Sequence, residues 1–136
     1  MFLLDTNILS EIIKKQPNQN LLSQIRTKSS QELFTSSICI MELRFGSALR
    51  DDFEAFWLKI DEEIISRVQI IPIGKREAMM AGDILAEMRK TDKTIGMEDA
   101  LIAASAMMNQ CIMVTTNVLH FSRIQGLTVE NWIGSV

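Results

Sequence analysis

The chain is poor in the residues that build zinc sites. Its 136 residues include two cysteines, Cys39 and Cys111, and one histidine. The cysteines form no CxxC motif, and a single histidine cannot complete a four-ligand zinc site with them. Both cysteines lie in apolar segments. We therefore expect buried free thiols in a reducing compartment, the cytoplasm.

Long apolar runs and an excess of positive charge are missing as well. No run approaches the roughly 20 apolar residues that span a bilayer, so we expect no membrane partner. The N-terminal segment carries Asp5 and no basic residue before Lys14, which is not the pattern of a signal peptide. The formal net charge of -3 argues against unspecific coating of nucleic acid. It leaves open a local basic patch, or an acidic site that meets phosphate through bound metal.

What is present is an ordinary composition for one folded domain, 1–136, with an apolar fraction of 47% and a charged fraction of 23%. Strand-like and helix-like patterns alternate along it. The expected strands are 2–4, 32–37, 69–73, 111–117 and 126–132. The expected helices are one capped by Thr6, one near 21–25, and 36–49, 52–68, 75–90 and 97–110. This order predicts an α/β sandwich with a mainly parallel sheet, whose ligands bind at the carboxyl ends of the strands.

Three acidic residues stand out because their neighbours are apolar. Asp5 follows Phe-Leu-Leu, Glu42 lies within Ile-Cys-Ile-Met-Glu-Leu, and Asp99 precedes Ala-Leu-Ile-Ala-Ala. Two of them have a simple structural explanation. Asp5 can cap the first helix, and Asp99 or Glu98 can complement the positive end of the helix that they begin.

Glu42 is harder to explain as a structural residue. It lies in an expected helix, and an unpaired buried carboxylate is costly. Pairing with Arg44 or Arg50 is one solution, although Arg44 is only two positions away and points elsewhere on a helix. The helix neighbours that we expect to be buried are Ile38, Leu43 and Phe45.

A shared site explains the three acids together. Carboxylates gathered from distant parts of the chain repel one another, and a cation relieves that repulsion. Ligand sets made only of oxygen select hard ions, so the expected cofactor is Mg²⁺ or Mn²⁺ rather than zinc. Such an ion suits phosphodiester hydrolysis, because it polarises a phosphoryl oxygen and lowers the pKa of a bound water.

Four segments together resemble the PIN-domain ribonucleases, and among these the VapC toxins of bacterial toxin–antitoxin pairs. The segments are FLLDTNIL, SSICIMELRFG, MEDALIAASA and VTTNVLHFSRI, which run in the family's order from position 2 to 124. Each segment is weak alone, but their order and spacing are specific. The resemblance implies a PIN-like α/β/α sandwich that covers nearly the whole chain.

The resemblance also implies the site residues. It makes Asp5, Glu42 and Asp99 the metal-binding catalytic acids, and Asn117 falls at the family's fourth polar or acidic position. His120 stands where related toxins often carry another acid. The residues expected to support the site are Thr6, Asn7, Glu98, Thr115 and His120.

In functional terms, the resemblance implies a metal-dependent endoribonuclease that cuts structured RNA, with tRNA the expected class. It implies a VapB-type antitoxin that covers the acidic groove, and a homodimer. Two other functions stay open at this point. Neutral Asn117 and His120 allow a catalytically weak or dead PIN fold that only binds protein or RNA. A strand-end Asp5 also allows an aspartyl-phosphate phosphatase, although DTN lacks the second Asp of that motif.

Overall fold

The computed structural model describes residues 1–134, which form a five-stranded sheet surrounded by helices. The strands are β1 (Phe2–Leu4), β2 (Leu33–Ser36), β3 (Gln69–Ile71), β4 (Ile112–Val114) and β5 (Val129–Glu130). The helices are α1 (Thr6–Ile12), α2 (Gln19–Arg26), α3 (Ser37–Ala48), α4 (Phe53–Glu63), α5 (Lys75–Lys90), α6 (Met97–Met108) and α7 (Val118–Phe121), with short 3-10 helices η1 (Ser30–Glu32) and η2 (Ile65–Arg67).

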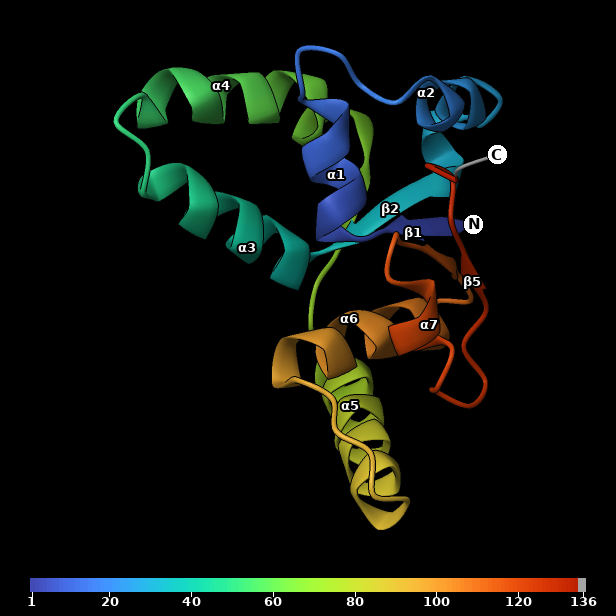
Figure 1. Ribbon diagram of the computed structural model, residues 1–136. Coiled ribbons are helices and arrows are strands. Elements are labelled where there is room, and N and C mark those ends of the chain that lie inside the picture. Colours follow the sequence, from blue (N-terminus) through green and yellow to red (C-terminus); the bar gives the residue numbers. More distant parts are fainter. Residues whose placement is uncertain (135–136) are drawn as a thin grey trace.

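Every strand pair in the sheet is parallel, and the strand order is β3-β2-β1-β4-β5. The first strand of the chain is therefore the central one: Leu3 pairs with Phe34 on β2 and with Met113 on β4. Figure 1 shows α1 and α2 on one side of the sheet, and α5, α6 and α7 on the other. The predicted α/β/α sandwich with a parallel sheet is confirmed. Because all five strands run the same way, their carboxyl ends meet at one edge.

The core lies between the sheet and the helices, as the apolar pattern requires. Leu3, Leu4, Met113 and Val114 are fully buried on the two central strands. The alanine-rich helix α6 is buried along most of its length. The expected free thiols are confirmed, since both cysteines are buried and unpaired. Within residues 1–134, no helix combines the length and the apolar character that a membrane span requires.

Several boundaries differ from the sequence-based expectation. The expected helix 52–68 ends at Glu63 and continues only as η2, and the expected strand 126–132 shortens to two residues. The strand expected over 111–117 stops at Val114: Thr115 N still donates to the backbone oxygen of Glu130 at 3.0 Å, and side chains bind the backbone amides that follow. Thr115 Oγ1 accepts from Asn117 N at 3.1 Å, and Asn7 Oδ1 accepts from Thr116 N at 3.2 Å. Asn117 then precedes α7, a helix that the pattern does not predict.

The aromatic face of α4 is covered by arginine side chains. The Arg44 guanidinium lies 4.5 Å from the ring centre of Phe53 and 4.7 Å from that of Trp57. The Arg50 guanidinium lies 3.8 Å from the ring centre of Phe56. These three aromatic side chains are therefore covered largely by contacts between α3, the residues that follow it, and α4.

Candidate active site

Asp5 stands at the carboxyl end of the central strand and is 6% exposed. Its Oδ1 accepts from the backbone N of Thr6 at 2.8 Å and caps α1. Its Oδ2 accepts from Thr115 Oγ1 at 2.8 Å and from Asn7 Nδ2 at 3.3 Å. The prediction that Thr6 caps this helix is wrong. Thr6 is instead the first helical residue, and one carboxylate both caps the helix and faces the site.

The hydroxyl that is not used for capping contacts the second acid. Thr6 Oγ1 donates to Glu42 Oε1 at 2.5 Å, which joins the start of α1 to α3. The suggested pairing of Glu42 with an arginine is wrong, because Arg44 lies over Phe53 and Trp57 and Arg50 pairs with Asp52.

The neighbours of Glu42 on α3 are only partly buried. Leu43 is buried as expected, but Phe45 is 67% exposed because it faces away from the sheet. Glu42 itself is half-buried. The face of α3 that carries Glu42 therefore lies beside an accessible cleft and does not lie in the core.

The third acid, Asp99, lies in the first turn of α6. Its Oδ2 is 3.0 Å from Nε2 of His120, which comes from α7. His120, one of the residues expected to support the site, therefore contacts one of the three acids. The neighbouring Glu98 is exposed and lies outside the residues that line the cleft described below.

One cleft brings the predicted catalytic residues together. It has a volume of about 510 Å³ and lies at the carboxyl edge of the sheet. Its lining includes Asp5, Glu42, Asp99 and Asn117, together with Thr6 and Asn7. Thr115 lies behind it, fully buried, with its hydroxyl on Asp5. Six predicted site residues, separated by up to 112 positions in the sequence, therefore line one cleft.

The cleft also contains residues that the sequence reasoning missed. Ser10, Glu11, Lys14 and Phe121 line it. With Asn7, the first three follow the i, i+3, i+4, i+7 spacing of one helix face. This polar stripe along α1, opposite the apolar stripe of the same helix, was the signal that could have identified them.

The site is strongly negative. Burial raises the pKa of Asp5 above its ordinary value, and the charges of Asp99 and Glu42 raise it further, against the hydrogen bonds from Thr115 and Thr6. Burial, followed by the charge of Asp5, raises the pKa of the Cys39 thiol to about 11. The fold therefore holds an acid whose ionised form is disfavoured by its surroundings, the condition that a bound cation relieves.

The donor set fits a hard divalent cation. Carboxylate oxygens dominate it, and the neutral donors around them are amide and hydroxyl groups. Within residues 1–134, no three His, Cys, Asp or Glu side chains lie close enough to make a complete metal cage. Magnesium does not require one, since it keeps several waters and binds through one or two carboxylates plus substrate phosphate.

A cleft lined by acids at the carboxyl edge of a parallel sheet is typical of α/β proteins that bind ligands there. Comparison with known proteins shows to which family this chain belongs. The sequence-family model of the PIN domain matches residues 2–127. The chain belongs to the PIN-domain family. It is 33% identical to ribonuclease VapC2 of Haemophilus influenzae, over 97% of this chain and 98% of that protein. It is 31% identical to the tRNA(fMet)-specific endonuclease VapC of Shigella flexneri, over 96% of this chain and 97% of that protein.

The solved structures agree with the sequence relatives. VapBC2 from Rickettsia felis, bound to a DNA fragment from its promoter, matches with a TM-score of 0.89 at 30% identity, over 96% of this chain and 98% of that one. The DNA-bound VapBC of Salmonella typhimurium matches with a TM-score of 0.88 at 31% identity, over 96% and 97%. The resemblance drawn from the four sequence segments is confirmed: the chain is a PIN-domain protein whose relatives are VapC ribonucleases.

Proposed function

We propose that this chain is a Mg²⁺- or Mn²⁺-dependent endoribonuclease, the toxin of a toxin–antitoxin pair, which hydrolyses phosphodiester bonds in structured RNA. The observation that supports it is the cleft that Asp5, Glu42, Asp99 and Asn117 share at the carboxyl edge of a PIN-domain sheet. The tRNA(fMet)-specific relative makes tRNA the substrate class to test first.

Each site residue has a proposed task. Asp5, Asp99 and Glu42 supply the carboxylates for the cation, one or two of them as direct ligands and the rest through water, and RNA phosphate would be a further ligand. The bound ion would polarise a phosphoryl oxygen and lower the pKa of a water. Asn117 offers an amide that contacts phosphate without adding charge. Thr115 and Asn7 keep the Asp5 carboxylate in place through their hydrogen bonds.

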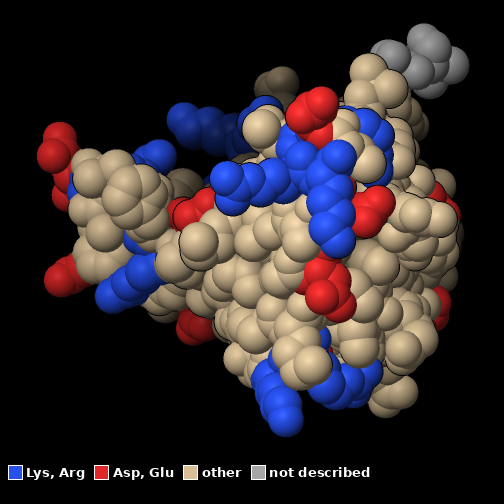
Figure 2. Space-filling model, turned by 90° about the horizontal axis from the view of Figure 1, so that it is seen from below, with Lys and Arg blue, Asp and Glu red and all other residues tan. Residues whose placement is uncertain are grey.

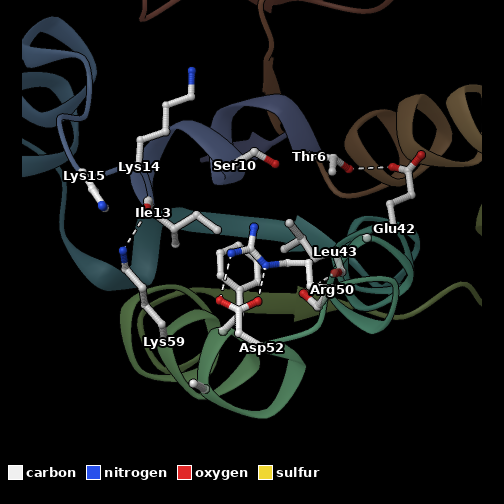
Figure 3. Close-up of a pocket in the computed structure, with 14 residues that line it drawn as sticks. Thr6, Ser10, Ile13, Lys14, Lys15, Glu42, Leu43, Arg50, Asp52 and Lys59 are labelled. Atoms are coloured by element: carbon white, nitrogen blue, oxygen red, sulfur yellow. Dashed lines mark hydrogen bonds and ion pairs between the residues drawn. The ribbon is translucent and has the colours of Figure 1, made fainter.

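A groove beside the cleft suits the RNA backbone on one side of the cleaved bond. It lies between α1, α3 and α4, has a volume of about 730 Å³, and shares four lining residues with the cleft: Thr6, Ser10, Lys14 and Glu42. In Figure 3, Lys14, Lys15 and Lys59 lie toward one end of this groove, and the Thr6–Glu42 hydrogen bond lies at the other. Lysines that lie along the groove beside the acids can contact phosphates on either side of the one that reacts.

The groove is not the whole basic surface of the molecule. Figure 2 shows a group of Lys and Arg side chains, with acidic side chains among them, on the face seen from below. Helix α5 lies toward this face in Figure 1 and ends in Arg89 and Lys90. Because the signs alternate there, position relative to the acid cleft, rather than charge alone, favours the groove as the RNA path.

The proposed partners follow from the family. Relatives of known structure are VapBC complexes, so we propose a VapB-type antitoxin whose segment covers the acid cleft. We also propose a homodimer that acts in the cytoplasm. A small neighbouring gene that encodes a DNA-binding protein, and whose product blocks cleavage in a mixture of the two purified proteins, would support the pairing. Lack of inhibition at equimolar concentration would contradict it.

Cleavage of purified tRNA tests the activity. The wild type should cut with Mg²⁺ or Mn²⁺ and stop when EDTA is added. Asp5→Asn and Asp99→Asn should abolish cutting, while Asp61→Asn, at an exposed acid of α4 outside the cleft, should cut normally. Undiminished cleavage by both cleft variants would end the assignment of these acids.

A binding-only PIN fold is the second candidate, and neutral Asn117 in the cleft is the observation that favours it. Calorimetric titration of the wild type with Mn²⁺ separates the two functions. We expect saturable binding that Asp5→Asn removes. No binding at millimolar Mn²⁺ would favour the binding-only protein.

A further inference from the structure

His120 stands in the acid cleft's neighbourhood where related toxins carry an acid, and its contacts define a different task. Its Nε2 lies 3.0 Å from Asp99 Oδ2, and its Nδ1 lies 2.8 Å from Nη2 of Arg123. We propose that Arg123 holds the His120 ring in one tautomer, and that His120 thereby positions Asp99 for the cation. The inference rests on the proposed metal site.

The tautomer follows from the chemistry of the arginine. A guanidinium group has only donors, so the ring nitrogen that faces Arg123 must accept and carries no hydrogen. The single ring hydrogen therefore sits on Nε2, the nitrogen that faces Asp99. The ring donates to Oδ2 of the carboxylate and brings no positive charge with it.

Arg123 is itself held firmly enough to impose this choice. Its Nε donates to the backbone oxygen of His120 at 2.9 Å, and its Nη2 donates to the backbone oxygen of Thr94 at 2.8 Å. The guanidinium thus joins α7 to the loop that leads into α6, the helix that carries Asp99. The Phe121 ring, edge-on at 4.9 Å between ring centres, limits rotation of the imidazole.

The arrangement suits a metal ligand. Within residues 1–134, His120 is the only hydrogen-bond partner of the Asp99 side chain, which leaves the second carboxylate oxygen available on the cleft side. A neutral donor fixes the orientation of a carboxylate and preserves its charge for the cation, as partners of metal ligands commonly do. Asp5 and Glu42 have equivalent neutral donors in Thr115 and Thr6, so His120 completes a pattern in which each acid has one.

The tautomer can be measured without metal or RNA. The chain has one histidine, so a two-bond ¹H–¹⁵N correlation spectrum of tag-free protein at mildly alkaline pH reports His120 alone. We expect the pattern of a ring protonated at Nε2. In Arg123→Met, which removes the donor to Nδ1, the two nitrogen signals should move toward each other as the tautomers exchange. A ring protonated at Nδ1, or unchanged signals in Arg123→Met, would overturn the inference.

Calorimetry with Mn²⁺ tests the positioning role. His120→Ala should weaken binding about 10- to 100-fold. His120→Gln, whose amide can place an N–H near the position of Nε2, should stay within about threefold of the wild type. Leu119→Ala is the matched control, because Leu119 lies on the same helix and is 88% exposed. Thermal unfolding without metal checks that each variant folds.

The outcomes separate this inference from the proposed function. Wild-type affinity in His120→Ala, or equal loss in His120→Gln and His120→Ala, would overturn the positioning role. A wild type that shows the Nε2–H tautomer but binds no Mn²⁺ would overturn the metal site, and with it the task assigned to His120, while the hydrogen bonds themselves stand.

Discussion

Asp5 and Asp99 face the same cleft but are held in different ways. Asp5 is 6% exposed and accepts three hydrogen bonds from the backbone, a hydroxyl and an amide. The side chain of Asp99 is 37% exposed and accepts one hydrogen bond, from His120. The first acid is immobilised by the centre of the fold, whereas the second depends on one neighbour. The difference indicates that the Asp5 side of the site is preformed. If the proposed function holds, we expect the more exposed Asp99 side to adjust when cation and RNA bind.

The largest effect should come from removing the preformed side. Loss of a partner of a metal ligand costs about 10- to 100-fold, so loss of the ligand itself in Asp5→Asn should lower tRNA cleavage by at least about 100-fold. In stability, the Asn side chain has one acceptor oxygen where Asp5 has two, so its NH₂ faces a donor and costs some stability at every pH. The raised pKa of Asp5 instead predicts how the difference in stability between variant and wild type changes with pH.

The pH dependence of that difference in stability has a definite sign. Since burial raises the pKa of Asp5 in the folded state, its favourable contribution is complete below the unfolded pKa of about 3.9 and is lost as pH rises through the folded-state pKa. An amide does not titrate. The free energy of unfolding of Asp5→Asn in urea, relative to that of the wild type, should therefore rise from about pH 4 to pH 7 and fall when Mn²⁺ is added to both proteins. A difference that stays constant, or that falls, over this pH range would contradict this.

A smaller effect should follow from breaking the Thr6–Glu42 hydrogen bond, which belongs to the preformed side. Thr6→Val removes the donor and keeps the shape of the side chain, so cleavage and Mn²⁺ affinity should fall about 10- to 100-fold. Thr6→Ser keeps the hydroxyl and should retain both. Equal behaviour of the two variants would mean that the hydrogen bond does not position Glu42.

Asn117→Asp tests the Asp99 side of the site, which we expect to be adjustable. It adds a fifth carboxylate to the cleft lining, beside those of Asp5, Glu11, Glu42 and Asp99. Added ligand charge tightens cation binding. We expect Mn²⁺ affinity to rise about tenfold, or a second ion to appear in the calorimetric stoichiometry. Unchanged affinity and stoichiometry would place Asn117 outside the reach of the cation. Thr116→Asp, one position earlier and exposed, is the control.

The smallest effects should come from the groove lysines. Lys15→Ala or Lys59→Ala should weaken RNA binding severalfold and lower the slope of log affinity against log salt by about 0.7 per lost contact with a single strand. Lys90→Ala, at the end of α5, should leave both unchanged. Equal effects of all three variants in a salt titration would show that the RNA follows no particular path.

The sequence predicts the layers of this fold better than the contacts of its site. Helix α5 has the expected limits, because Gly74 precedes it and the Glu77 carboxylate accepts from Gly74 N. The first helix was assigned the wrong cap because Asp5 and Thr6 are adjacent and both are good caps. Only the packing of β1 beside β4, and of α1 beside α3, decides which of the two faces Glu42.

The contact between His120 and Arg123 was harder to predict, again because it depends on how distant segments pack. The sequence marks His120 as a site residue. Its contact with Arg123 depends on where α7 lies relative to the loop that contains Thr94. No periodicity in the sequence marks a four-residue helix such as α7. Local sequence patterns thus identify the acids. The neutral groups that orient these acids are seen only in the structure, because they lie on segments distant in the sequence.

The Asn7 side chain shows what this distance means during synthesis of the protein. Its amide contacts Asp5, two residues away, and Thr115 and Thr116, more than 100 residues away. The central strand β1 leaves the ribosome first, yet β4 beside it leaves among the last. A nascent chain therefore carries Asp5, Glu42 and Asp99 before β4 and Thr115, which complete the surroundings of Asp5, have been made.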